Sequence, residues 1–266
     1  MTRDLMFQSE IRNVVRSTYG RLPGGAGRAM AERLYSEEQL AGLPDDAIDW
    51  SLGVGNPVAH AALRPGERIV DLGCGGGIDS ILAAREVGPT GTVTGVDTLT
   101  EMCERTRQAA GTAGVAEWCD AVQGELEDLP LPDDSADAVV SNGVVNLSPR
   151  KSRALAEAAR VLRGGGRLCI ADFVVNDDLP PEVLTSSAAW AGCIAGALSE
   201  EVLVKKLMKA GFTEIELGER IPFGIDDVAV YPLFDDAVIQ LMKRVVPEPE
   251  QRRIATSVIA KAVRAG

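Results

Sequence analysis

The chain has few basic residues for its length, and this shortage argues against whole classes of partner. Its 266 residues include 27 Lys and Arg against 39 Asp and Glu, which gives a formal net charge of −12. Nucleic-acid backbones are bound through Lys and Arg, and anionic membrane surfaces attract the same residues. The composition therefore predicts that the protein binds neither nucleic acid nor membrane.

Long apolar runs and patterned cysteines are also missing. No run is long enough to span a bilayer, and the first residues, Met-Thr-Arg-Asp-Leu, lack the apolar core of a signal peptide. The five cysteines are odd in number and match neither zinc-site spacing nor a disulfide framework. We therefore expect a cytoplasmic protein with reduced thiols and no metal site, acting as a monomer or homodimer.

From about residue 67 onward, apolar strand-like runs alternate with helical patterns. Such alternation implies crossover helices between parallel strands, so we expect a doubly wound α/β sheet with helices on both faces. The expected strands are 68–72, 92–96, 119–123, 136–141, 167–171, 212–217 and 254–263, and the expected helices are 9–19, 78–87, 101–113, 150–161 and 200–210. A partly helical insertion is expected at 223–246.

The first strand runs into a glycine-rich turn that indicates the kind of ligand. Residues 69–77 read Ile-Val-Asp-Leu-Gly-Cys-Gly-Gly-Gly, and glycine permits positive φ and close approach of a ligand. A dinucleotide site needs a third glycine where Ile78 stands, and residues 71–84 contain no Lys or Arg to meet a pyrophosphate. S-adenosylmethionine (SAM), a cationic adenosine derivative without phosphates, suits the turn better. The candidate cofactor residues here are Asp71, Gly73, Cys74 and Gly75.

Polar residues at the ends of the following strands extend this candidate site. Asp97 closes the second strand, where a carboxylate can accept both ribose hydroxyls; the alternative is a helix N-cap. The loop after the third strand can meet an adenine edge or be a solvated acidic turn. Asn142 closes the fourth strand and is expected to support the cofactor or substrate. The further candidates are Thr98, Met102, Gly124, Glu125 and Leu126.

These segments resemble the serial motifs of class I SAM-dependent methyltransferases, at residues 71–75, 95–97, 129–130 and 161–166. A closer similarity, over about residues 14–212, is to the arsenite methyltransferases. It is carried by residues 35–38, 52–57, 141–149 and 190–198. The resemblance implies a seven-stranded, mostly parallel Rossmann-like sheet that includes a reversed strand. It also implies a helical cap with a cofactor-covering loop at 1–63, a SAM-binding core at 64–175, and an acceptor lid with the final strands at 176–266.

The cysteines depart from the arsenite methyltransferase pattern. That family holds As(III) with several thiolates, which suit a soft metalloid ion. Here Val54 replaces the expected cysteine of the 52–57 loop, no cysteine follows Cys193, and only Cys193 stands at a matching position. We therefore expect a small organic acceptor with a thiol, amine or hydroxyl group, and S-adenosylhomocysteine (SAH) as product. The alternatives are arsenite methylation with fewer cysteines, a SAM-binding protein, or a cyclase on the same scaffold.

The expected reaction is in-line displacement at the sulfonium methyl, so a base is needed only for a protonated acceptor. His60, the single histidine, follows the 52–57 loop and is a candidate base; the alternative is a partly exposed helix residue. Asp172 closes the fifth strand and is the other candidate, or a cap. The candidate substrate residues are Asn146, Trp190 and Cys193, each with a structural alternative as a cap or a packed side chain.

Overall fold

The computed structural model describes residues 2–25, 27–175, 189–190, 192–234 and 236–266. Its seven strands form one sheet in the order β3-β2-β1-β4-β5-β7-β6. The strands β1 to β5 pair in parallel, and β7 is antiparallel to both of its neighbours. This confirms the expected doubly wound sheet with a reversed strand. The strands are β1 (Arg68–Leu72), β2 (Thr92–Asp97), β3 (Cys119–Gln123), β4 (Ala136–Asn142), β5 (Leu162–Val174), β6 (Phe212–Phe223) and β7 (Ala255–Arg264).

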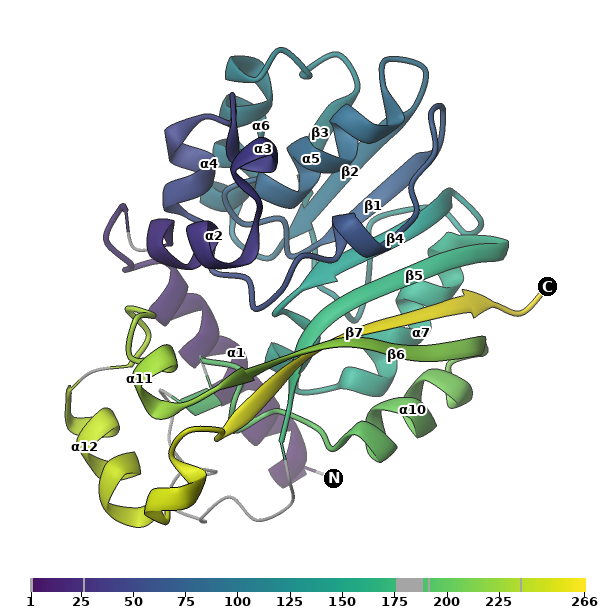
Figure 1. The fold of residues 1–266 in the computed structure, drawn as a ribbon. Helices are drawn as coiled ribbons and strands as arrows, with labels where there is room; N and C mark the ends of the chain where they lie inside the picture. Colours follow the sequence, from purple (N-terminus) through teal and green to yellow (C-terminus); the bar gives the residue numbers. More distant parts are fainter. Residues whose placement is uncertain (1, 26, 176–188, 191, 235) are drawn as a thin grey trace.

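Two hydrophobic layers cover the sheet, because alternate strand residues point to opposite faces. On one face Ile69 packs with residues of α5 (Ile78–Val87) and α6 (Thr100–Thr112). On the other face Val70 packs with residues of α7 (Lys151–Val161) and α10 (Glu200–Lys209). Figure 1 shows these two pairs of helices on opposite sides of the sheet.

Two strands are longer than the sequence predicts. β5 begins at Leu162, and not at residue 167, because Leu162 pairs with Ala136 across a register shift that carries the strand through Gly164–Gly166. β6 extends to Phe223 because two register shifts keep it paired with β7. Local sequence does not reveal such bulged pairings, since they depend on the partner strand.

Further helices precede the first strand and lie between the last two strands of the chain. The N-terminal region holds α1 (Thr2–Tyr19), α2 (Arg28–Leu34), α3 (Glu37–Leu40), α4 (Asp45–Asp49) and the 3-10 turn η1 (Val58–His60). The insertion between β6 and β7 contains α11 (Ile225–Val228), α12 (Asp236–Val245) and the turn η3 (Glu248–Glu250), so its expected partial helicity is confirmed. The start of the expected acceptor lid, residues 176–188, lies outside the described residues. Within the described part of the chain, none of the helices is both long and apolar enough to cross a membrane.

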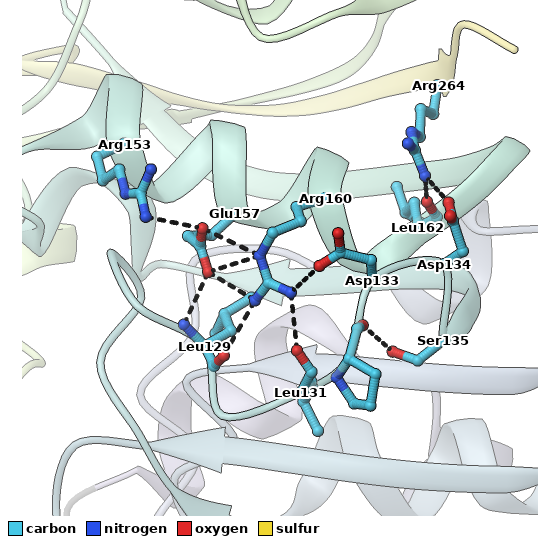
Figure 2. A network of polar contacts seen from close by, with 11 residues as sticks. Leu129, Leu131, Asp133, Asp134, Ser135, Arg153, Glu157, Arg160, Leu162 and Arg264 are labelled. Carbon is cyan, nitrogen blue, oxygen red and sulfur yellow. Dashed lines mark hydrogen bonds and ion pairs between the residues drawn. The ribbon is translucent and has the colours of Figure 1, made fainter.

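A network on α7 holds the loop that follows β3. Glu157 Oε2 accepts a hydrogen bond from the Leu129 backbone nitrogen at 3.0 Å, and Arg160 donates to the Leu129 and Leu131 carbonyls (Figure 2). Arg153 donates to the Glu127 carbonyl at 3.0 Å. Burial favours a raised pKa for Glu157, but the hydrogen bonds from Arg160 and Leu129 outweigh it and lower that pKa. The network fixes the loop that supplies one wall of the cavity described next.

Candidate active site

A cavity lies at the carboxyl ends of β1, β2, β3 and β4, the edge where ligands bind in doubly wound sheets. The turn after β1 and the strand ends form its floor, and α1 forms part of its cover. Ten of the predicted cofactor residues line it: Gly73, Cys74, Gly75, Asp97, Thr98, Met102, Gly124, Glu125, Leu126 and Asn142. Leu52, Gly53, Leu147, Ser148 and Pro149, from the segments that carry the family resemblance, also line it. The lining residues that the sequence did not indicate as site residues include Arg12, Val15, Arg16, Tyr19, Trp50, Ser51 and Asp79.

The turn after β1 requires glycine for two physical reasons. Gly73 has φ of 74°, and a Cβ there would lie 2.3 Å from Val144 Cγ2. Gly75 has φ of 51°, and Gly77, with φ of 92°, is the N-cap of α5. L residues rarely adopt these left-handed conformations. The turn therefore keeps its backbone open to the cavity and starts α5 directly behind it.

Asp97 is held rigidly at the end of β2. Its Oδ2 accepts a hydrogen bond from the Gly75 nitrogen at 3.1 Å, and its Oδ1 accepts one from the Leu99 nitrogen at 2.9 Å. Burial raises the pKa of Asp97 while these backbone hydrogen bonds oppose the rise. Leu99, and not Asp97, occupies the N-cap position of α6. The geometry therefore leaves a fixed carboxylate facing the cavity, as a ribose site needs.

Asp71 lies behind the turn, outside the cavity lining of the described chain. Its Oδ2 accepts a hydrogen bond from Ser80 Oγ at 2.6 Å. Burial raises the pKa of both Asp71 and Asp79, and the nearby Asp79 raises that of Asp71 further. Asp71 therefore joins β1 to α5, while Asp79 is the carboxylate of this pair that lines the cavity.

Asn142 connects the strand ends to the loop before β1. Its Oδ1 accepts hydrogen bonds from the Val54 and Gly55 nitrogens at 2.8 and 3.1 Å. Its Nδ2 donates to the Gly55 carbonyl, to the Tyr35 hydroxyl and to Asp79 Oδ2 at 2.8–3.0 Å. The expected supporting role fits this geometry, because one side chain positions the whole loop that covers the cavity.

Two arginines of α1 form ion pairs with acidic residues of the loop after β3. Arg16 forms an ion pair with Glu125 and donates to Thr98 Oγ1 at 3.2 Å, and Thr98 in turn donates to Glu125 at 2.8 Å. Arg12 Nη2 lies 3.5 Å from Glu127 Oε2. The amphipathic pattern of residues 9–19 predicts the helix, but it does not reveal the partners of these arginines, which lie more than 80 residues away in the sequence.

Two buried polar atoms at the cavity lack a hydrogen-bond partner in the described chain, and they indicate a polar ligand. They are Ser51 Oγ and Arg12 Nε, and both residues line the cavity. Buried polar groups are normally satisfied, so such atoms indicate a missing partner. The charged lining comprises the four acids Asp79, Asp97, Glu125 and Glu127 against Arg12 and Arg16. An acidic cavity with a fixed carboxylate and free polar atoms fits the sulfonium, ammonium and hydroxyl groups of SAM.

The remaining site candidates lie outside this lining. His60 Nε2 is 3.3 Å from Glu219 Oε2 and does not line the cavity of the described chain. Asp172 is buried, and its oxygens accept hydrogen bonds from the Asn146 backbone, the Asn146 side chain and the Phe173 backbone at 2.7–3.0 Å. Burial raises the pKa of Asp172 to about 6. Asp172 and Asn146 thus form one structural unit behind the Leu147–Pro149 wall.

The expected acceptor residues Cys193 and Trp190 belong to the same region. Cys193 Sγ donates to the Gly143 carbonyl at 2.9 Å, and burial raises the pKa of this thiol. Lys151 Nζ lies 4.9 Å from the Trp190 ring centre, and burial lowers the pKa of Lys151 to about 8. Within the described residues, no group of three or more His, Cys, Asp or Glu side chains is placed to hold a metal ion.

Cys74 and Cys103 lie near each other beneath the turn after β1. Together with Ala121 they form a small buried cluster. The reason is that α6 begins directly after β2, which brings its first turns back over the neighbouring β1 turn.

Comparison with known proteins identifies the relatives of this chain. A family model described as methyltransferase domain matches residues 63–218. An arsenite methyltransferase of Halobacterium salinarum is 42% identical over 71% of this chain and 48% of its own length. A fatty-acid O-methyltransferase of Mycolicibacterium smegmatis is 33% identical over 55% of this chain and 53% of its own. The chain spans about half the length of these curated relatives.

A solved structure extends the match to nearly the whole chain. The arsenic(III) S-adenosylmethionine methyltransferase of Chlamydomonas reinhardtii superimposes with a TM-score of 0.63 at 28% identity. The superposition covers 95% of this chain and 73% of the algal protein. The similarity therefore includes the N-terminal cap and the final strands as well as the central sheet.

Proposed function

Because the chain belongs to the methyltransferase domain family, we propose that it transfers the methyl group of SAM to a small organic acceptor. The observation that carries this proposal is the acidic cavity at the strand ends, where Asp97 is fixed by the Gly75 and Leu99 nitrogens. A carboxylate in this position accepts hydrogen bonds from two vicinal hydroxyls. SAM carries no phosphate, so its site needs no cationic phosphate-binding group.

The other cofactor contacts follow from the cavity lining. Glu125 and Leu126 would hold the adenine edge, and the Gly73–Gly75 turn would lie against the methionine end. Ser51 Oγ would supply a hydrogen bond to a polar group of the cofactor, which would satisfy its own buried oxygen. When bound, SAM supplies an electrophilic methyl group, so the protein's task is to position the acceptor and exclude water.

The acceptor is proposed to enter between α1 and the segment that follows β4. Val15, Leu147 and Pro149 give this part of the cavity apolar contacts, while Arg12 Nε is a buried donor in need of an acceptor atom. An organic molecule with an apolar body and one polar group matches this combination. Its nucleophile would be a thiol, an amine or a hydroxyl.

Proton transfer is assigned only a minor part in the reaction. Both oxygens of Asp172 accept hydrogen bonds from Asn146 or Phe173, so we propose that Asp172 positions the Asn146–Leu147 turn. His60 is paired with Glu219 and receives no role in the transfer. An acceptor that is already deprotonated at working pH needs no base.

Arsenite is a second candidate acceptor, favoured by the relatives and by Cys193. The Halobacterium and Chlamydomonas proteins are named for arsenic chemistry. The sequence resemblance also implies that Cys193 stands at a cysteine position of that family. Against it, the Cys193 thiol donates to the Gly143 carbonyl, and burial raises its pKa, which disfavours the thiolate that As(III) requires. Val54 is a buried aliphatic residue in the covering loop.

The cofactor assignment is tested by calorimetry of SAH binding to the wild type and to Asp97→Asn. The substitution keeps the size of the side chain and removes its charge, so we expect about 100-fold weaker binding. Asp226→Asn is the matched control, because Asp226 pairs with Lys243 far from the cavity. Unchanged SAH affinity in Asp97→Asn, with the control also unchanged, would contradict the assignment.

Cellular location is part of the same proposal. The five cysteines are free and buried, which suits a reducing compartment such as the cytoplasm.

A further inference from the structure

We propose that the methyl acceptor carries a carboxylate, which Arg12 and Arg150 bind in a second pocket beside the cofactor cavity. This outer pocket lies between α1 and the loop after β3. Its charged lining consists of Arg12, Arg16, Arg150, Glu125, Glu127 and Asp128. The inference rests on the proposed function, because it names the class of acceptor for the same site.

The outer pocket adjoins the cofactor cavity, since four residues line both. They are Arg12, Arg16, Glu125 and Glu127. The residues that would fix the cofactor, Asp97 and the Gly73–Gly75 turn, line the cavity and not the outer pocket. A carboxylate bound in the outer pocket therefore anchors the acceptor and is not the group that receives the methyl.

Both walls of this passage change from an apolar residue to an arginine. On α1, Val15 lines only the cavity, whereas Arg12, which lies one helical turn earlier on the same side, lines both spaces. After β4, Pro149 lines only the cavity and the next residue, Arg150, lines only the outer pocket. A molecule with an apolar body and a carboxylate at one end matches this change.

Arg12 has hydrogen-bond donors to spare. Its guanidinium makes no hydrogen bond within the described chain, and its ion pair there joins Nη2 to Glu127 Oε2 at 3.5 Å. This distance exceeds that of a normal N–H···O hydrogen bond. Glu127 uses its other oxygen to accept a hydrogen bond from Ser148 Oγ at 2.6 Å. The Arg12 side chain is 35% exposed, so a ligand can reach it.

Arg150 is the second arginine with free donors. It is exposed, and its side chain has neither a hydrogen bond nor an ion pair in the part of the chain that the structure describes. Arg153 and Arg160, which follow it on α7, both pair with Glu157 instead (Figure 2). The planar fork of a guanidinium matches the two oxygens of a carboxylate, so Arg12 and Arg150 suit this group.

The charge of the outer pocket favours a carboxylate over a phosphate. Its three arginines face three acids, and Arg16 already pairs with Glu125. Asp128 is exposed and has no side-chain partner within the described residues. These acids repel a doubly charged phosphate more strongly than a singly charged carboxylate. Inorganic phosphate is therefore the contrasting anion in the test.

The test is calorimetric titration of the SAH-bound chain with octanoate, phenylacetate and cinnamate, each compared with its neutral primary amide. We expect at least one carboxylate to bind about tenfold tighter than its amide, and phosphate to bind more weakly than that carboxylate. Arg150→Gln and Arg12→Gln should each weaken carboxylate binding about tenfold and leave amide binding unchanged. Arg64→Gln is the matched control, because Arg64 is an exposed arginine ahead of β1, at the amino ends of the strands.

Three results would overturn the proposal: no carboxylate binds better than its amide, phosphate binds as tightly as the best carboxylate, or both glutamine variants keep the carboxylate preference. If Arg150→Gln does not fold, Arg150→Lys replaces it. The lysine keeps the charge but not the fork, so it should retain part of the preference. Failure of the proposed function has a different signature, because the wild type would then not bind SAH. Titration of the SAH-free chain with the same carboxylates and amides would still decide whether the anion site exists.

Discussion

Cys193 is the residue that best separates the two candidate acceptors. Its sulfur donates to the Gly143 carbonyl, and Gly143 lines the cavity on its other side. In this position the thiol supports the cavity wall. Burial raises its pKa, so the thiolate form is disfavoured at neutral pH.

Replacing Cys193 by serine should therefore leave SAH affinity and organic methyl transfer nearly unchanged. The hydroxyl can make the same hydrogen bond, so we expect a loss of folding stability of about 1 kcal/mol from the more polar buried group. Calorimetry and a denaturant titration measure the two effects. Cys169→Ser is the matched control, since Cys169 Sγ contacts the Pro57 carbonyl elsewhere in the core. Loss of SAH binding only in Cys193→Ser would contradict a purely supporting role.

At the residue scale, the sequence predicts those site residues whose position is fixed by the strand, turn and helix pattern around them. Gly73 and Asp97 were predictable because strand, turn and helix patterns fix their place at a strand end. Ser51 and Arg12 were not, because an unpartnered buried atom exists only once distant segments have packed. Asp71 was expected at the cofactor, whereas the structure directs its carboxylate toward Ser80, a partner that follows nine residues later.

At the scale of elements, α1 covers part of the cavity. Its arginines Arg12 and Arg16 contact Glu127 and Glu125 on the loop after β3, and Val15 and Tyr19 of the same helix also line the cavity. That loop is itself anchored on α7 by Glu157 and Arg160 (Figure 2). Helix α1 and the loop after β3 are thus linked by partly exposed ion pairs, and each such pair contributes little to stability.

Arg16→Met should speed SAH release with little effect on folding. The methionine keeps apolar contact and loses the pairing with Glu125 and Thr98, so we expect release to be about fivefold faster and stability to change by less than about 1 kcal/mol. Stopped-flow displacement of SAH measures the release rate. Arg21→Met, at an exposed arginine beyond α1, is the matched control. An unchanged release rate for Arg16→Met would mean that α1 does not retain the cofactor.

The elements that the sequence predicts well are the parallel strands bounded by turn residues. Strands β1 to β4 match their expected ranges within one residue, because turn signals on both sides limit each short strand pattern. β5 and β6 run longer than expected because bulged pairing with their neighbours extends them. Helix α1 begins earlier than predicted, at Thr2 instead of residue 9.

At the scale of the whole molecule, the carboxyl ends of strands β1 to β4, which hold the candidate cofactor residues, lie at one edge of the sheet. Asn142 connects that edge to the N-terminal region by three hydrogen bonds with the Val54 and Gly55 backbone and one with the Tyr35 hydroxyl, and it makes a fifth with Asp79. Cofactor positions follow from this arrangement, which the chain shares with its relatives.

The most direct measurement is transfer of a deuterated methyl group from SAM, followed by mass spectrometry of the products. Small thiols, amines and phenols are compared with arsenite supplied together with glutathione. We predict label on an organic acceptor, an equal amount of SAH, and no labelled methylarsenicals. Labelled methylarsenicals with no organic product would contradict an organic acceptor. Bound SAM that stays intact with every acceptor would contradict methyl transfer itself.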